Sequence, residues 1–159
     1  MASTVSAAKL KVKITEEVIL DGKDQGDTTE LTISSISEIS KRILTITTTE
    51  STIATFSAAV ASAGHYVAAD ARYIRFTNLD DTNFITLTFR NQDNDEVAIK
   101  LDYGQSIILN GDNANGMTAI FNATEDADAA SSTNFGSLTN IQAAADTDSC
   151  DLEVFIASV

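Results

Sequence analysis

Residues 73–109 read YIRFTNLDDTNFITLTFRNQDNDEVAIKLDYGQSIIL, and this stretch decides the fold. Apolar and polar side chains alternate with a period of two, which is typical of β-strands that bury one face. The segments between the alternating runs, Asp80–Asn83, Asn91–Asp95 and Tyr103-Gly104, have the composition of turns. Four consecutive antiparallel strands are therefore predicted, over residues 73–78, 84–90, 97–101 and 105–109.

The same alternation continues on both sides of this stretch. Leu10, Val12 and Ile14 alternate with lysines and predict an N-terminal strand with a charged outer face. The pairs Asn110-Gly111 and Asn115-Gly116 are typical of tight turns. Further strands are predicted over residues 18–20, 31–36, 43–49, 117–121 and 152–156. About eight to ten short strands at this spacing indicate an all-β fold, an antiparallel β-sandwich of jelly-roll-like type.

Length and composition favour a single domain. The chain has 159 residues, which is the size of one typical domain. We expect residues 1–8 to form an N-terminal arm and residues 9–159 a single β-sandwich domain. The Ala-rich stretch 56–71 is expected to be a loop or a helical turn. A long irregular segment is expected at about 122–147, where Ala, Ser, Asp and Asn dominate.

The charge balance excludes several partners. Asp and Glu number 23 against 10 Lys and Arg, so the formal net charge is −13. All ten basic residues lie at or before Lys100, and the nine acidic residues after it have no basic counterpart. Such a chain lacks the clustered cations that bind nucleic acid, and it is repelled by anionic membranes. We expect the acidic C-terminal part to face water and the basic part to meet a partner.

The sequence contains no proline. Many β-proteins use proline to protect the edges of their sheets, since proline cannot donate to a strand ladder. Lys9, Lys11 and Lys13 could protect one edge by charge, and neighbouring subunits could cover others. The sequence therefore favours a homo-oligomer, for which a trimer is one option.

Candidates for catalysis are few. Cys150 and His65 are the only residues of their types, and acidic neighbours of Cys150 oppose formation of a reactive thiolate. No nucleophile-elbow motif is present. We therefore expect no enzyme activity, no catalytic residue and no cofactor. Arg72, Arg75 and Arg90 flank the middle strands, where we expect outward positions or salt bridges between subunits.

Three acidic clusters are candidates for calcium sites. They are the series Asp21, Asp24, Asp27 and Glu30, the loop Asp93–Glu96, and the pair Asp112-Asn113. None has the spacing of an EF-hand loop, so polar turns are favoured and no metal ligand is predicted. The chain has no Trp and only three Tyr, so it offers few aromatic rings on which a sugar could stack. A calcium- or carbohydrate-binding β-sandwich module remains the second alternative.

One segment resembles a known class of proteins. The residues Thr77-Asn78-Leu79-Asp80 end one predicted strand, and Leu101, Gly104 and Ser106 precede a later one. This arrangement resembles small virion structural proteins of tailed bacteriophages, particularly those of aquatic and cyanobacterial phages. The resemblance implies a virion component without an enzyme site, made in the host cytoplasm. A head decoration or cement protein that contacts itself and the major capsid protein is the favoured expectation, and a tail, collar or fibre component is the alternative.

Overall fold

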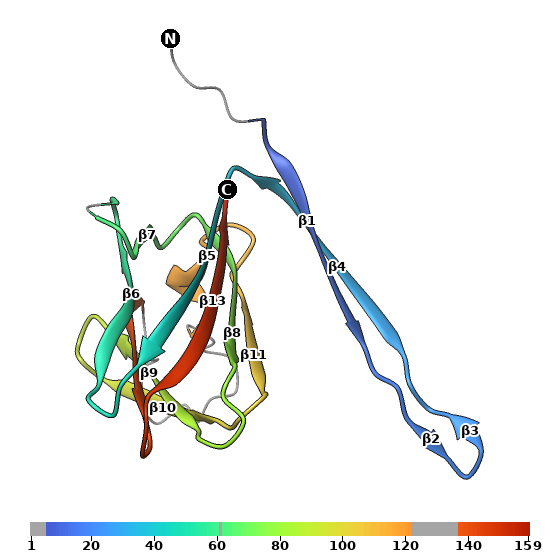
Figure 1. Ribbon diagram of the computed structural model, residues 1–159. Coiled ribbons are helices and arrows are strands. Elements are labelled where there is room, and N and C mark those ends of the chain that lie inside the picture. Colours follow the sequence, from blue (N-terminus) through green and yellow to red (C-terminus); the bar gives the residue numbers. More distant parts are fainter. Residues whose placement is uncertain (1–5, 61, 122–136) are drawn as a thin grey trace, which may run out of the picture.

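Two β-sheets pack face to face, and a long β-hairpin projects from one end of the resulting sandwich (Figure 1). The computed structural model describes residues 6–60, 62–121 and 137–159. One sheet has the strand order β11-β8-β13-β5, and the other has the order β10-β9-β12-β6-β7. These strands are β5 (Glu38–Ile46), β6 (Ser51–Ser57), β7 (His65–Val67), β8 (Ala71–Asn78), β9 (Ile85–Asn91), β10 (Glu96–Leu101), β11 (Ser106–Asn110), β12 (Leu138–Ala145) and β13 (Cys150–Ser158).

The order of the strands is that of a jelly roll. The chain changes sheets from β5 to β6, from β7 to β8, from β8 to β9, and at each step from β10 to β13, whereas β9 and β10 form a hairpin within one sheet. The set β5-β13-β8-β11 thus faces the set β6-β12-β9-β10, as in an eight-stranded jelly roll. β7 adds a short parallel strand beside β6. The predicted all-β, jelly-roll-like sandwich is confirmed.

The hydrophobic core lies between the two sheets. Alternate residues of β13, Leu152, Val154 and Ile156, point inward and are almost completely buried. Phe76 of one sheet and Phe89 of the other are fully buried, and their rings meet edge to face with centroids 6.5 Å apart. Each such side chain contributes about 1.5–3 kcal/mol on burial. The sandwich is therefore the stable unit of the molecule.

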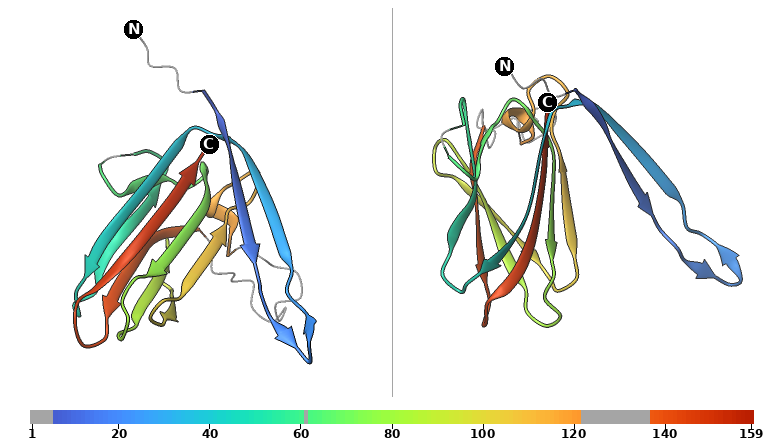
Figure 2. Two further views of the ribbon diagram at one scale, coloured as in Figure 1. Left: turned by 45° about the vertical axis from the view of Figure 1, so that its right-hand side comes forward. Right: turned by 45° about the horizontal axis from the view of Figure 1, so that its top comes forward.

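The hairpin, called the arm below, consists of residues 8–36. Its main strands are β1 (Ala8–Thr15) and β4 (Thr28–Ile36), and its tip contains β2 (Ile19–Leu20) and β3 (Lys23–Asp24). Asp21 and Gly22 have φ values of 51° and 73°, which suit the tight two-residue turn at the tip. The arm leaves the sandwich near the end of β13 and diverges from it (Figure 2).

The chain bends where the arm joins the sandwich. Ser35 has a φ of 64°, a left-handed conformation that separates β4 from β5. The Ser37 amide donates a hydrogen bond to the Ser158 carbonyl oxygen at 2.9 Å. Ile36 is buried at this junction, 3% exposed. The junction thus fixes the base of the arm to the last strand of the sandwich.

The structure differs from the expected domain limits. The arm extends to residue 36 rather than residue 8, because β1 pairs only with β4 and neither strand joins a sheet of the sandwich. Within the irregular segment expected at 122–147, residues 138–145 form β12 in the middle of a sheet, and residues 122–136 lie outside the described residues. A register shift between Leu138 and Asn140 interrupts the alternation that would have revealed β12.

Two local predictions were wrong, and a third was right in part. Residues 117–121 form no strand, because Gly116 (φ 57°) redirects the chain into a 3-10 helix, Met117–Ala119, and Met117 enters the core. Asn110-Gly111 is not a tight turn, since the Gly111 amide donates to the Arg72 carbonyl oxygen at 2.8 Å. The stretch 56–71 is irregular or turn at residues 58–60, 62–64 and 68–70, as expected, but it also contains β7 and the end of β6.

Candidate assembly surface

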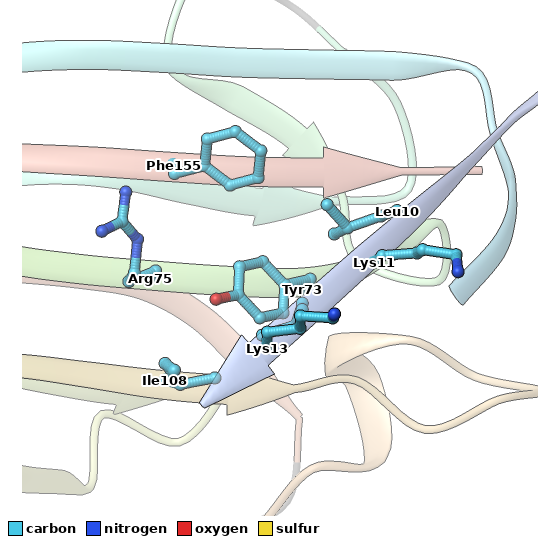
Figure 3. Close-up of a pocket in the computed structure, with 8 residues that line it drawn as sticks. Leu10, Lys11, Lys13, Tyr73, Arg75, Ile108 and Phe155 are labelled. Carbon is cyan, nitrogen blue, oxygen red and sulfur yellow. The ribbon is translucent and has the colours of Figure 1, made fainter. Parts of the chain in front are cut away.

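A crevice separates the arm from the outer face of the four-stranded sheet. Its volume is ≈ 290 Å³, and β1 contributes residues from Leu10 to Lys13 to its lining. The sheet contributes Tyr73, Ile108 and Phe155, which are apolar over most of their surface, together with Arg75. Figure 3 shows β1 crossing this sheet, with Leu10 beside Phe155 and Tyr73. The base of the arm is thus packed on the outside of the sandwich.

Apolar and lysine side chains alternate along β1, so the arm has two unlike faces. Leu10 pairs with Ile33 and Val12 pairs with Leu31 across the ladder, so these four side chains share one face. The lysines of β1 lie on the other face, where Lys11 and Lys13 approach Glu30 with N–O distances of 3.1 and 3.5 Å. One face of the arm is apolar and the other is charged.

The sandwich covers only the inner part of the apolar face. Leu10, Val12 and Ile33 are partly buried against Tyr73 and Ala157. Farther out, Ile14 and Leu31 are 46% and 41% exposed. At the tip, the residues Val18, Ile19 and Leu20 are 48%, 78% and 65% exposed. The described part of the chain therefore leaves these apolar side chains of the outer arm exposed.

An ion-pair cluster occupies the centre of the outer sheet face. Glu153 of β13 contacts Lys41 of β5 at 3.0 Å and Arg75 of β8 at 2.5 Å. The hydrogen-bonded Lys41 ammonium, with the charge of Arg75, lowers the pKa of the Glu153 carboxyl. Burial raises the pKa of the nearby Tyr73 phenol, and the charge of Arg75 opposes that shift. These ion pairs link β13 to β5 and to β8 on this face.

The three arginines singled out in the sequence have partners within the chain. Arg75 pairs with Glu153, and Arg90 pairs with Glu96 across the β9–β10 hairpin. Arg72 donates a hydrogen bond to the Ala69 carbonyl oxygen at 2.5 Å. Each of these three contacts joins two residues of the same sandwich.

Cys150 and His65 are not brought together. Cys150 begins β13 at one end of the four-stranded sheet, whereas His65 begins β7 at the edge of the other sheet (Figure 1). Cys150 is 1% exposed, and burial together with the nearby carboxylates, first among them Asp80, raises the pKa of its thiol. The sulfur lies 3.5 Å from the Asp148 carbonyl oxygen. This environment is that of a structural thiol.

The acidic clusters considered as calcium sites are engaged in turns and ion pairs. Asp112 accepts hydrogen bonds from the amides of Ala114 and Asn115, which lower the pKa of its carboxyl. Asp24 likewise accepts a hydrogen bond from the Gly26 amide. Over the described ranges 6–60, 62–121 and 137–159, no group of three or more His, Cys, Asp or Glu side chains is arranged to hold a metal ion.

The residues that carry the resemblance meet at one end of the sandwich. Asn78 is completely buried and donates hydrogen bonds to the carbonyl oxygens of Asn83 and Leu101. Asp80 accepts hydrogen bonds from the two amides of the following turn, which lower the pKa of its carboxyl. Ser106 hydrogen-bonds to the Thr77 hydroxyl at 2.8 Å. These residues therefore shape the loops at this end of the fold.

Comparisons with known proteins identify no relative. No family model, curated protein or solved structure matches the chain. In the part of the chain that the structure describes, no helix has the length and apolar character needed to cross a membrane.

Sequence reasoning missed the platform on which the arm rests. A signal was present in β13, where Phe155 and Ala157 lie between inward-facing apolar residues, so that both faces of the strand are apolar. On β5, Ile39 and Ile43 point outward, and Leu44 and Ile46 point inward farther along the strand. Apolar residues on both faces of a strand indicate a cover on each side.

Proposed function

We propose that this chain is a non-enzymatic structural subunit of a tailed-phage virion, a head decoration or cement protein that stabilises the head through subunit contacts. The observation that carries the proposal is the projecting arm, whose outer apolar residues are left exposed by the described residues 6–60, 62–121 and 137–159. Exposed apolar surface of this kind marks a site of association. The residues that carry the resemblance add support, as does the jelly-roll topology, which is recurrent in capsid proteins.

The charge distribution agrees with an outward position. The chain carries a formal net charge of −13, which disfavours a place against packaged DNA. The β10–β11 and β12–β13 loops lie at the end of the sandwich remote from the arm base (Figure 1), and the second of them carries the exposed Asp146 and Asp148. In the proposed orientation, this acidic end faces water and the arm contacts other subunits.

Mass spectrometry of purified, nuclease-treated particles tests the proposal. We expect the chain to co-purify with intact heads at high copy number. Particles produced without the chain should release their genome at a lower temperature, and addition of the purified chain should restore the original value. Absence of the chain from the particle would refute the proposal. Presence only on isolated tails, at low copy number, would instead assign it to the tail, collar or fibre.

A further inference from the structure

The tip of the arm and two sites in the sandwich share a reactive dipeptide, in which Asp or Asn precedes Gly. We propose that Asp21-Gly22 at the tip converts to isoaspartate in the folded protein, whereas the two Asn-Gly pairs of the sandwich are protected by the fold. The proposal goes beyond the proposed function and does not depend on it. The three acidic or amide residues are all exposed, so access of water does not distinguish the pairs, which are Asp21-Gly22, Asn110-Gly111 and Asn115-Gly116.

The reaction needs only water and a glycine nitrogen that can reach the neighbouring side chain. The Gly22 amide nitrogen loses its proton and bonds to Cγ of Asp21, the bond from Cγ to its hydroxyl oxygen breaks, and one water molecule leaves a cyclic imide. Water then adds to one of the two ring carbonyls. Cleavage between Cγ and the nitrogen restores aspartate, whereas cleavage between the main-chain carbonyl carbon and the nitrogen leaves the chain linked through Cγ, which is isoaspartate. An Asn side chain follows the same path but releases ammonia in the first step.

In the sandwich, the glycine amide of each Asn-Gly pair is held in place. The Gly111 amide donates a hydrogen bond to the Arg72 carbonyl oxygen at 2.8 Å, and the Gly116 amide donates one to the Asp112 carbonyl oxygen at 2.9 Å. Space is also lacking, since a Cβ at either glycine would lie 2.5 Å from a backbone carbonyl oxygen. The nitrogen must leave its acceptor and turn toward the asparagine side chain before an imide can form. Both pairs are thus protected while the surrounding sandwich is folded.

At the tip of the arm, the glycine amide is not held in this way. Within the described residues 6–60, 62–121 and 137–159, no hydrogen bond engages the Gly22 amide. A Cβ at Gly22 would meet nothing within 4 Å, so the turn is surrounded by open space. The flanking strands β2 and β3 pair over two residues each, and Ile19 and Leu20 are 78% and 65% exposed. Few contacts must break for this turn to open, so the pair should react at nearly the rate of an unfolded chain.

Conversion would change the shape of the tip. Isoaspartate adds one carbon atom to the main chain between Asp21 and Gly22 and leaves the free carboxylate on the α-carbon. The tight turn has two residues at positive φ, 51° and 73°, and the lengthened chain no longer matches this geometry. The pairing of β2 with β3 should therefore be lost, and the apolar side chains of the tip should move.

The variant Asp21→Asn gives a matched comparison, because it places the same dipeptide at all three positions of one molecule. Asparagine tolerates the positive φ of the turn, so the hairpin is retained. The folded full-length variant is incubated in neutral buffer, and peptide mass mapping follows deamidation at residues 21, 110 and 115. We expect residue 21 to deamidate at least about tenfold faster than Asn110 or Asn115, because only its glycine is released by local opening. In guanidinium chloride, where the sandwich is unfolded, the three rates should become similar.

The wild-type chain tests the natural site. Isoaspartate at residue 21 is quantified by methyl transfer with an isoaspartyl methyltransferase, and it is located by fragmentation of the peptide in a mass spectrometer. We expect its rate of formation in the folded chain to lie within about threefold of the rate in guanidinium chloride. Asp21→Ala should abolish this signal. Equal rates at the three positions of the folded Asp21→Asn variant would overturn the inference, as would isoaspartate at residue 21 that forms only after unfolding.

Discussion

The arm and the sandwich are built from the same kind of strand but are stabilised in different ways. In the sandwich, the inward residues of β8 and β13 are almost completely buried between two sheets. In the arm, Ile36 at the base is the one residue of β1 and β4 that is buried. A two-stranded hairpin is only marginally stable by itself in water. The contrast indicates that the sandwich holds its own core, whereas the outer arm has little buried surface to stabilise it.

Hydrogen exchange gives the largest expected contrast between the two regions. In the monomer, amides of the outer arm near Ile14 should exchange at least about a thousandfold faster than those of β8 and β13, because the arm opens locally while the core exchanges only on global unfolding. In the assembled state, the arm amides should slow markedly while the core amides change little. Equal protection of the arm and the core in the monomer would contradict the comparison.

Removal of a core ring should affect the sandwich far more than truncation of an exposed side chain at the tip of the arm. Phe76→Ala deletes a fully buried ring that meets Phe89, and we expect the free energy of unfolding to fall by about 3–5 kcal/mol. Ile19→Ala at the tip is the control, because Ile19 is 78% exposed, and its effect should stay within about 0.5 kcal/mol. Urea denaturation followed by circular dichroism measures both. A similar loss for the two variants would show that the arm and the sandwich unfold together.

The sequence predicted the sandwich well because its central strands follow a strict period of two. The runs within β8, β9, β10 and β11 were identified to within two residues at each end. β12 escaped detection because a register shift and small Ala side chains conceal its inward face. Alternation reports which residues share a face, but it says nothing of how a strand is paired.

The candidate surface could be predicted only in part. The alternation of Leu10, Val12 and Ile14 with lysines correctly indicated a strand with a charged face and an apolar face. That this strand pairs only with β4, outside both sheets, depends on the bend at Ser35 and on packing against Tyr73 and Phe155. These contacts join residues distant in sequence, so the extent of the arm could not be deduced from local patterns.

Glycine substitutions compare the two regions at two positions of positive φ. Gly116 in the sandwich and Gly22 in the arm have φ values of 57° and 73°. A Cβ at Gly116 would lie 2.5 Å from the Ala68 carbonyl oxygen, whereas a Cβ at Gly22 would meet nothing within 4 Å. We expect Gly116→Ala to cost about 2–3 kcal/mol of global stability, and Gly22→Ala to leave the thermal midpoint of the sandwich unchanged. Differential scanning calorimetry distinguishes the two, and equal shifts in the midpoint would contradict this expectation.

The smallest expected difference concerns one ion-pair cluster in each region. Glu153→Gln should lower the stability of the sandwich by about 1 kcal/mol at pH 7, the scale of a partly exposed ion pair. Glu153 holds Lys41 and Arg75 and is 13% exposed, whereas Glu30 of the arm is 36% exposed and should lose less on the same substitution.

The pH dependence gives the sharper measurement. The folded-state pKa of Glu153 is lowered from its ordinary value of 4.5, chiefly by the hydrogen bond from Lys41. Its contribution to stability is therefore complete above the unfolded-state pKa and is lost as the pH falls through the lower folded-state pKa. Urea titrations of the wild type and Glu153→Gln should accordingly differ at pH 7 and converge as the pH is lowered below 4.5. A difference that stays constant through this range would mean that Glu153 stabilises the sheet by packing rather than by charge.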